Sequence, residues 1–186
     1  MSTTHSPNDT PAIMAADADA RYALAANRFG PALQRLASGY EWRPATREDL
    51  LQDIHLQLWR SLASFDGRCS LKTWVYRVAH NVAADHVRRS MRGSKVLSLE
   101  DLEQAGNQVP VPSPEDEVSD RLTLARIHQL LHRLEPLDRQ VMLLYLEGED
   151  AAAIAEVTGL SAGAVATRIH RIKRLLANHF DRSASR

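Results

Sequence analysis

The feature that most limits the possible folds is an acidic, proline-bearing segment between two stretches of helical periodicity. Residues 98–120 hold seven acids and three prolines and no lysine or arginine. Such a segment has little to bury, and its prolines interrupt helices. On both sides apolar residues recur at intervals of three and four, and no stretch has the alternation of a strand. The sequence therefore predicts an all-α protein with a disordered tail (1–18), a helical domain (19–95), a flexible acidic linker (96–119) and a second helical domain (120–186).

Three helices are predicted in the first domain. The first runs from Ala20 to Leu36, with Gly39 as a stop signal. Thr46 is the expected N-cap of the second helix, because acids follow it in the first turn. The apolar stripe of that helix is Leu51, Ile54, Leu58 and Leu62. The third helix covers residues 71–92, and its apolar stripe is Leu71, Val75, Val78 and Val82.

The second domain is predicted to end in a helix-turn-helix. Helices are expected over 120–134, 136–146 and 150–158, and Gly159 ends the last of these. Ser161 can then cap a further helix. Val165, Ile169, Ile172 and Leu176 form its buried stripe. Small and basic residues form the opposite face, as DNA reading requires: Gly163, Thr167, His170, Arg171 and Arg174. A helix that merely closes a bundle with a solvated basic face is the alternative.

Charge is segregated along the chain although the formal net charge is zero. Residues 68–95 hold seven Lys or Arg against one acid, and residues 160–186 hold six against one. Residues 147–159 hold four acids and no base. Two basic patches separated by acidic segments favour binding to nucleic acid at two places.

Two further helix faces suggest different partners. The exposed face of the predicted third helix combines basic side chains, an amide and an aromatic ring, which suit single-stranded or melted nucleic acid. Its members are Thr73, Arg77, His80, Asn81, Ala84 and Arg88, with Trp74 at the border. The exposed face of the second helix is acidic with one leucine, which suits docking to a protein: Asp49, Gln52, Asp53, Leu56 and Arg60. A plain solvated face is the alternative in both cases.

Three stretches resemble a known family when they are taken in order. They are DLLQDIHLQLWRSL, FDGRCSLKTWVYRVAHNVAADHVRR and LHRLEPLDRQVMLLYLEGEDAAAIAEVTGLSAGAVATRIHRIKRLL. Together they are similar to regions 2 and 4 of an extracytoplasmic-function (ECF) sigma factor, a bacterial transcription initiation subunit. Three positions depart from the family pattern: His55 replaces an aromatic, Ala153 replaces an acid, and Ala166 replaces a lysine in the recognition helix.

The resemblance implies partners and roles for particular residues. The implied contact with the β′ clamp helices of core RNA polymerase comprises Asp49, Gln52, Asp53, Leu56 and Trp59. The implied contact with the melted minus-10 element comprises Arg68, Lys72, Trp74, Arg77, Asn81 and Arg88. The implied contact with the duplex minus-35 element comprises Ser161, Gly163, Thr167, Arg168, His170, Arg171 and Arg174. Region 4 also contacts the β flap in the family, and an anti-sigma factor is a common further partner.

Other functional classes have weaker support in the sequence. A helix-turn-helix regulator that does not dock on polymerase is the main alternative. HQLLH, residues 128–132, has the histidine spacing of a zinc protease, but Gln129 replaces the general-base glutamate. We therefore expect neither catalysis nor a metal or cofactor. The chain has no bilayer-length apolar run and no secretory signal, and its single Cys69 cannot form an internal disulfide. These features predict a cytoplasmic protein.

Overall fold

The computed structural model describes residues 17–90 and 131–184, with side chains up to residue 177. The described residues form only helices, which confirms the all-α prediction. The helices are α2 (Ala18–Tyr40), α3 (Pro44–Leu62), α4 (Leu71–Ser90), α7 (Pro136–Leu146), α8 (Ala151–Thr158) and α9 (Ala162–Ala184). Nearly all of the predicted tail, the linker and the helix expected over 120–134 lie outside the described residues.

Local signals explain where several helices begin and end. The carboxylate of Asp17 accepts a hydrogen bond from the Ala20 N–H at 2.7 Å and caps α2. Asp150 caps α8 in the same way at 2.8 Å. Gly159 ends α8 with a φ of 76°, a left-handed conformation that costs glycine little. Ser161 Oγ then accepts from the Ala164 N–H at 3.2 Å, as the sequence predicted for the start of α9.

Three predicted helix boundaries were wrong, one of them the helix end expected at residue 134, because residues 132–134 are not helical. Helix α3 begins at Pro44, before the expected cap Thr46, because proline fits the first turn, where its missing N–H is not needed. Gly39 lies inside α2 and does not end it. A Cβ on Gly39 would lie 2.4 Å from Leu143 Cδ2. Gly39 therefore allows a close approach between α2 and α7.

Helix α4 lies at the centre of the molecule. It packs against α2 and α3 on one side and against α7 and α8 on the other. The buried residues of α4 consequently extend beyond the predicted stripe, of which Val78 and Val82 are only half-buried. Thr73 and His80 were predicted on an exposed face but are buried. This prediction was wrong because Glu156 of α8 contacts Thr73, and Tyr40 of α2 contacts His80.

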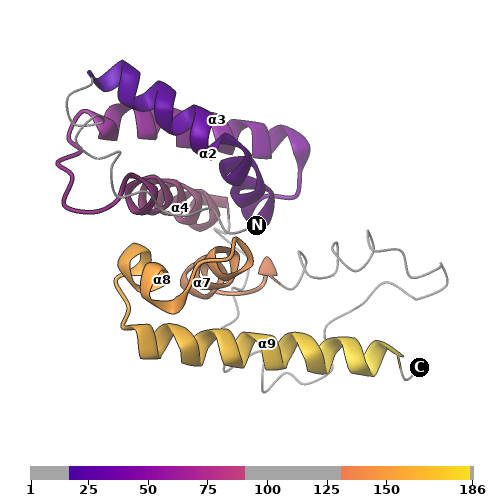
Figure 1. The fold of residues 1–186 in the computed structure, drawn as a ribbon. Coiled ribbons are helices and arrows are strands. Elements are labelled where there is room, and N and C mark those ends of the chain that lie inside the picture. Colours follow the sequence, from indigo (N-terminus) through magenta and orange to yellow (C-terminus); the bar gives the residue numbers. More distant parts are fainter. Residues whose placement is uncertain (1–16, 91–130, 185–186) are drawn as a thin grey trace.

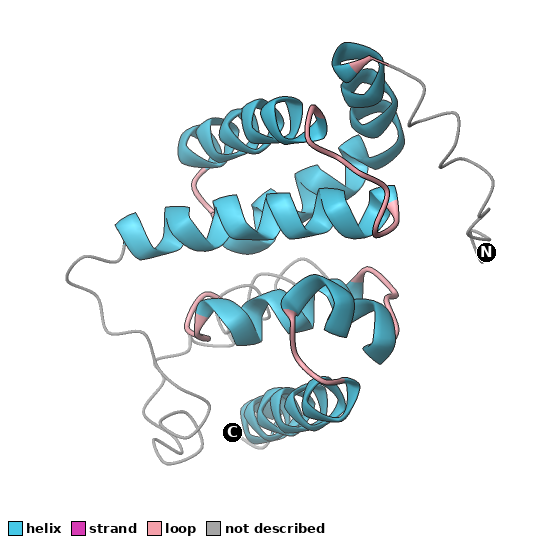
Figure 2. Cartoon of the chain, turned by 90° about the vertical axis from the view of Figure 1, so that its left-hand side faces the viewer, coloured by secondary structure: helices cyan, strands magenta, loops and turns pink. Residues whose placement is uncertain are grey.

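Figures 1 and 2 both place α9 on the far side of α7 and α8 from α4. The hydrophobic core is continuous through this stack. In α3 its buried residues are Leu50, Ile54, Leu58 and Leu62, so Leu50 takes the fully buried place that was expected for Leu51. Val165 and Ile172 of α9 are buried and Ile169 and Leu176 pack against them, as the predicted stripe requires.

Candidate nucleic-acid and polymerase interfaces

The predicted duplex-reading face of α9 is accessible. Its side chains project from the helix surface opposite Val165 and Ile172, the two residues that bury α9 against the fold. Four of its members are exposed and Arg171 is half-exposed; the four are Gly163, Thr167, His170 and Arg174. Short α8, the Gly159 turn and the Ser161 cap set the direction of α9. This arrangement is that of a helix-turn-helix with its second helix free to enter a major groove.

Arg168 differs from the other predicted members of this face. Its guanidinium donates to the carboxylate of Asp138, whose side chain is only 3% exposed in the first turn of α7. The Arg168 side chain is itself 32% exposed. A buried carboxylate needs such a partner, since leaving it alone is costly. In this structure Arg168 therefore joins α9 to α7.

The predicted minus-10 residues of α4 divide into two groups. Arg68, in the loop before α4, pairs with Asp66, and Arg88 pairs with Asp85; both arginines are mostly exposed, as is Asn81. These contacts are of the weak surface kind that a phosphate can replace. The other two cations, Lys72 and Arg77, contact α7–α8 instead and are described below.

Trp74 is anchored within the first domain. Its ring meets that of Phe65 edge-on with centroids 5.5 Å apart. Its indole N–H donates to Ser61 Oγ at 3.2 Å. The residue is half-buried, so one part of the ring packs and the remainder faces outward. Trp74 thus contributes to the packing of α4 on α3 whatever else it contacts.

The predicted docking face of α3 is exposed over its full length. Asp49, Gln52 and Asp53 are exposed, and Leu56 and Trp59 are each 46% exposed. The indole N–H of Trp59 donates to Asp19 of α2 at 2.7 Å, which fixes the ring against the helix surface. A pair of large apolar side chains beside acids is the composition of a protein-binding patch.

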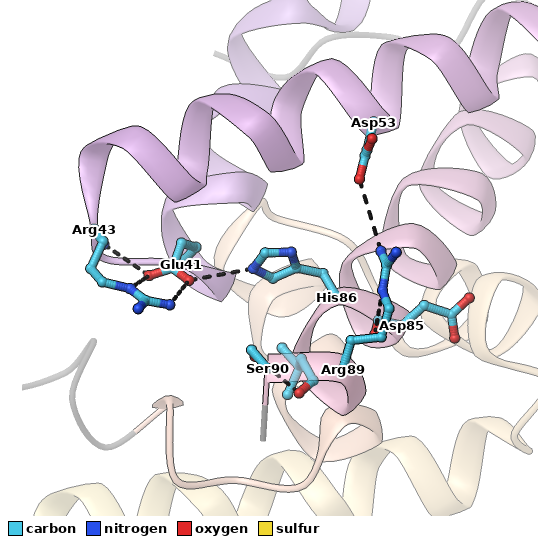
Figure 3. Close-up of polar contacts among 8 residues, drawn as sticks. Glu41, Arg43, Asp53, Asp85, His86, Arg89 and Ser90 are labelled. Atoms are coloured by element: carbon cyan, nitrogen blue, oxygen red, sulfur yellow. Dashed lines mark hydrogen bonds and ion pairs between the residues drawn. The ribbon is translucent and has the colours of Figure 1, made fainter. Parts of the chain in front are cut away.

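Figure 3 shows how this face is connected to α4. Asp53 lies 3.8 Å from the guanidinium of Arg89 near the end of α4. Between α2 and α3, the buried carboxylate of Glu41 accepts hydrogen bonds from the Arg43 guanidinium at 3.0–3.1 Å. The same carboxylate lies 3.3 Å from His86 Nε2 of α4. Burial alone would raise the pKa of Glu41, but these hydrogen bonds outweigh it and lower the pKa to about 2. The corner between α2 and α3 is thereby fixed to α4.

A buried polar cluster was missed by the sequence reasoning. Tyr40 OH and His80 Nδ1 form a hydrogen bond of 2.9 Å, and Arg139 of α7 lies 5.6 Å above the Tyr40 ring. Burial lowers the pKa of His80 to about 3 and that of Arg139 to about 10. Arg139 donates from Nε and Nη2 to carbonyls at the end of the preceding turn, including those of Leu131 and Leu134, whereas its buried Nη1 has no hydrogen-bond partner among the described residues. Only the polar character of these residues was visible in the sequence.

His55, which departs from the family pattern, makes both a ring contact and a polar contact with Tyr22. Its ring meets Tyr22 edge-on at 6.1 Å, and Nδ1 lies 3.1 Å from the tyrosine hydroxyl. Cys69 is half-buried and burial raises the pKa of its thiol, which disfavours the reactive thiolate. Within the described part of the chain, no three metal-ligating side chains gather and no helix could cross a membrane.

Two family models match the chain: Sigma-70 region 2 over residues 25–93 and Sigma-70 region 4 over residues 124–176. The chain is 32% identical to RNA polymerase sigma factor NccH of Alcaligenes xylosoxydans, over 80% of this chain and 81% of that protein. It is 31% identical to RNA polymerase sigma factor CnrH of Cupriavidus metallidurans, over 94% and 96% respectively.

Solved structures agree on the fold. The structure of CnrH in complex with the cytosolic domain of CnrY matches with a TM-score of 0.64 and 24% identity, over 92% of this chain and 94% of that one. Sigma factor RpoE in complex with the anti-sigma factor NepR from Bartonella quintana matches with a TM-score of 0.60 and 20% identity, over 84% and 94%. With the matched regions 2 and 4 and relatives above 30% identity along most of its length, this chain belongs to the ECF family of RNA polymerase sigma factors.

Proposed function

We propose that this protein binds core RNA polymerase through α3, holds the melted minus-10 element with α4 and the loop before it, and reads the duplex minus-35 element with α9. The observation that carries the proposal is the presence of three distinct surfaces on one chain: an acidic and apolar face on α3, and basic faces on α4 and α9. A sigma factor needs all three, whereas a plain DNA-binding regulator needs only one.

The mechanism requires no covalent chemistry. The guanidinium groups of Arg68 and Arg88 can neutralise the backbone of a single strand, and exposed Asn81 can hydrogen-bond a base edge. The half-buried ring of Trp74 offers a stacking surface for a base. The energy that separates the strands comes from capture of unpaired bases and from backbone contacts. The duplex contacts of α9 set the position of the protein on the promoter.

The partners of the relatives suggest a further level of control. The two solved structures named above hold sigma factors in complex with another protein, CnrY or the anti-sigma factor NepR. We propose that an anti-sigma factor likewise binds this chain. We also propose that the sigma factor itself acts in the cytoplasm, where polymerase and promoters are found. The domains proposed for these roles are residues 19–95 and 120–186, joined by the acidic segment 96–119.

The proposal is tested by run-off transcription with core RNA polymerase on a pool of promoter fragments from the source genome. Discrete transcripts that require the protein are expected, and they would also identify the promoter sequence. Polymerase binding without transcripts would refute promoter selection by this chain alone. Failure to bind polymerase would favour the regulator that does not dock.

A point substitution tests the docking face directly. Leu56→Asp replaces one of the two exposed apolar residues of α3, Leu56 and Trp59, with a charged one. We expect the affinity for polymerase to fall by at least about ten-fold. Leu56 is preferable to Asp53, because Asp53 also pairs with Arg89. Gln57→Asp, an exposed neighbour outside the face, is the matched control. Equal loss in both variants would show that only net charge matters and would remove the assigned docking face.

A further inference from the structure

The helix pair α7–α8 presents acidic residues to basic residues of the first domain. Arg35 of α2 donates to both carboxylate oxygens of Glu147 at 2.7 Å, a two-point contact of fixed geometry. Lys72 at the start of α4 lies 2.5 Å from Glu149, whose side chain is 9% exposed. These two contacts join residues from opposite halves of the chain, so they hold the halves together.

Helix α8 contacts the same region of α4. Arg77 donates to the main-chain oxygen of Glu156 at 2.6 Å. The Glu156 carboxylate in turn accepts from the Thr73 hydroxyl at 3.2 Å. Lys72 and Arg77 are thus both held by α7–α8, although both are candidates for phosphate contacts in the minus-10 complex.

Close packing accompanies the charged contacts. Gly39 fits against the end of Leu143, and no side chain could stand at position 39 without displacing it. One helical turn away from Leu143, Arg139 lies over the Tyr40 ring. Leu143 is 8% exposed and Arg139 is fully buried. The interface therefore has an apolar and aromatic centre with ion pairs around it, as stable protein interfaces do.

The packing of α7–α8 on α4, called the closed arrangement below, covers part of the proposed DNA surface on α4 and leaves the one on α9 accessible. Helices α7 and α8 lie directly on α4, whereas α9 faces away from it (Figures 1 and 2). Gly163, Thr167, His170 and Arg174 remain exposed. Two predicted minus-10 cations are occupied while most of the minus-35 face is accessible.

We propose that packing of α7–α8 on α4 is an autoinhibitory contact, in which Glu149 and Glu156 occupy the cations that a melted minus-10 strand must reach. This inference rests on the proposed DNA-binding role of α4. Binding of the strand requires the open state, so its apparent affinity is reduced by the fraction of protein that is open. Duplex binding by α9 carries no such penalty.

Charge reversal at Arg35 tests the contact without altering a residue of either DNA surface. In Arg35→Glu the pair is lost and two carboxylates repel each other; Arg35→Glu/Glu147→Arg restores the attraction. The probes are the single non-template minus-10 strand and the minus-35 duplex of a promoter found by run-off transcription, each titrated into the free full-length protein. We expect the single variant to bind the strand about three- to ten-fold more tightly and the duplex within about two-fold of wild type. The double variant should return to the wild-type value.

Opening itself is measured separately, which distinguishes failure of this inference from failure of the proposed function. Spin labels at Gln57→Cys on α3 and Ala177→Cys on α9, in a Cys69→Ser background, report the distance between the two halves. Wild type and the double reversal should give one narrow distance distribution across the stack, and Arg35→Glu a broader one shifted to a different distance. An unchanged distance would refute the closing role of Arg35 and Glu147. Opening without any gain in single-strand affinity would refute the masking of α4.

Position 39 provides an independent test with a matched control. Gly39→Gln must displace Leu143, whereas a Cβ on Gly30, in the same helix, meets nothing within 4 Å. Both substitutions replace a glycine of α2 with the same residue, so the comparison controls for the loss of a glycine while only position 39 touches the interface. Gly39→Gln should lengthen the distance and tighten single-strand binding; Gly30→Gln should do neither. Identical behaviour of the two variants would overturn the proposal.

Discussion

Replacing Arg168 with alanine separates a structural role in α9 from a role in reading DNA. The substitution removes one charged partner of Asp138, a carboxylate that is 3% exposed. Breaking a fully buried pair costs about 3–5 kcal/mol, and an exposed pair contributes about 0–1 kcal/mol. Arg168 is 32% exposed, and Asp138 lies in the first turn of α7, where the helix dipole favours its charge. We therefore expect Arg168→Ala to lower the free energy of unfolding by about 1–3 kcal/mol.

The assay is urea unfolding of the full chain, followed by circular dichroism, together with titration of minus-35 duplex. Arg174→Ala is the matched control, because Arg174 is exposed on the same helix. It should change stability by no more than about 0.5 kcal/mol and weaken duplex binding through a lost phosphate contact. Arg168→Ala unfolding at the same urea concentration as Arg174→Ala would refute the structural role of Arg168. A larger loss of duplex affinity at unchanged stability would assign Arg168 to DNA reading.

The remaining predictions concern buried groups of the first domain. The pKa of His80 is about 3 in the folded state and 6.5 when unperturbed, so the unfolded chain takes up the proton first as pH falls below 6.5. The free energy of unfolding should then fall by about 2 kcal/mol between pH 7 and pH 5, and His80→Gln should reduce this slope. Glu41 acts at lower pH, because its pKa is about 2 in the folded state and 4.5 when unperturbed. An equal slope in wild type and variant, measured by urea unfolding at both pH values, would contradict the assignment. Trp74→Ala should lower stability by about 2 kcal/mol through lost packing on Phe65, and an unchanged unfolding midpoint would mean that the ring serves only DNA.

Local sequence signals predicted the start and end of α7 and the turn between α8 and α9 well. The bounds of α7 match the expected 136–146, and Gly159 and Ser161 mark the turn as predicted. These signals succeed because a left-handed glycine and a capping hydroxyl act within a few residues of their own position. The stripe of α9 was also predictable, since that helix has one buried side.

Contacts between distant segments could not be predicted in the same way. Glycine commonly ends helices, but Gly39 lies inside α2, where Leu143, in the other half of the chain, leaves no room for a side chain. Periodicity assumes one buried face for each helix, and α4 has two because helices from both halves pack on it. The pairing of Arg168 with Asp138 likewise depends on how α7 meets α9. The residue types were visible in the sequence, whereas their partners were set by tertiary packing.

The length of α9 has a consequence for how this chain could change its promoter preference. Its 23 residues span about 34 Å, which is about one full turn of duplex DNA. A straight helix cannot follow a groove that curves around the duplex over that distance, so base contacts are restricted to the early turns. Farther along, Ile172 is buried and Leu175 and Leu176 pack against the core. Substitutions in the early turns can therefore shift base preference while the later turns continue to anchor the helix, so specificity and stability can evolve separately along one element.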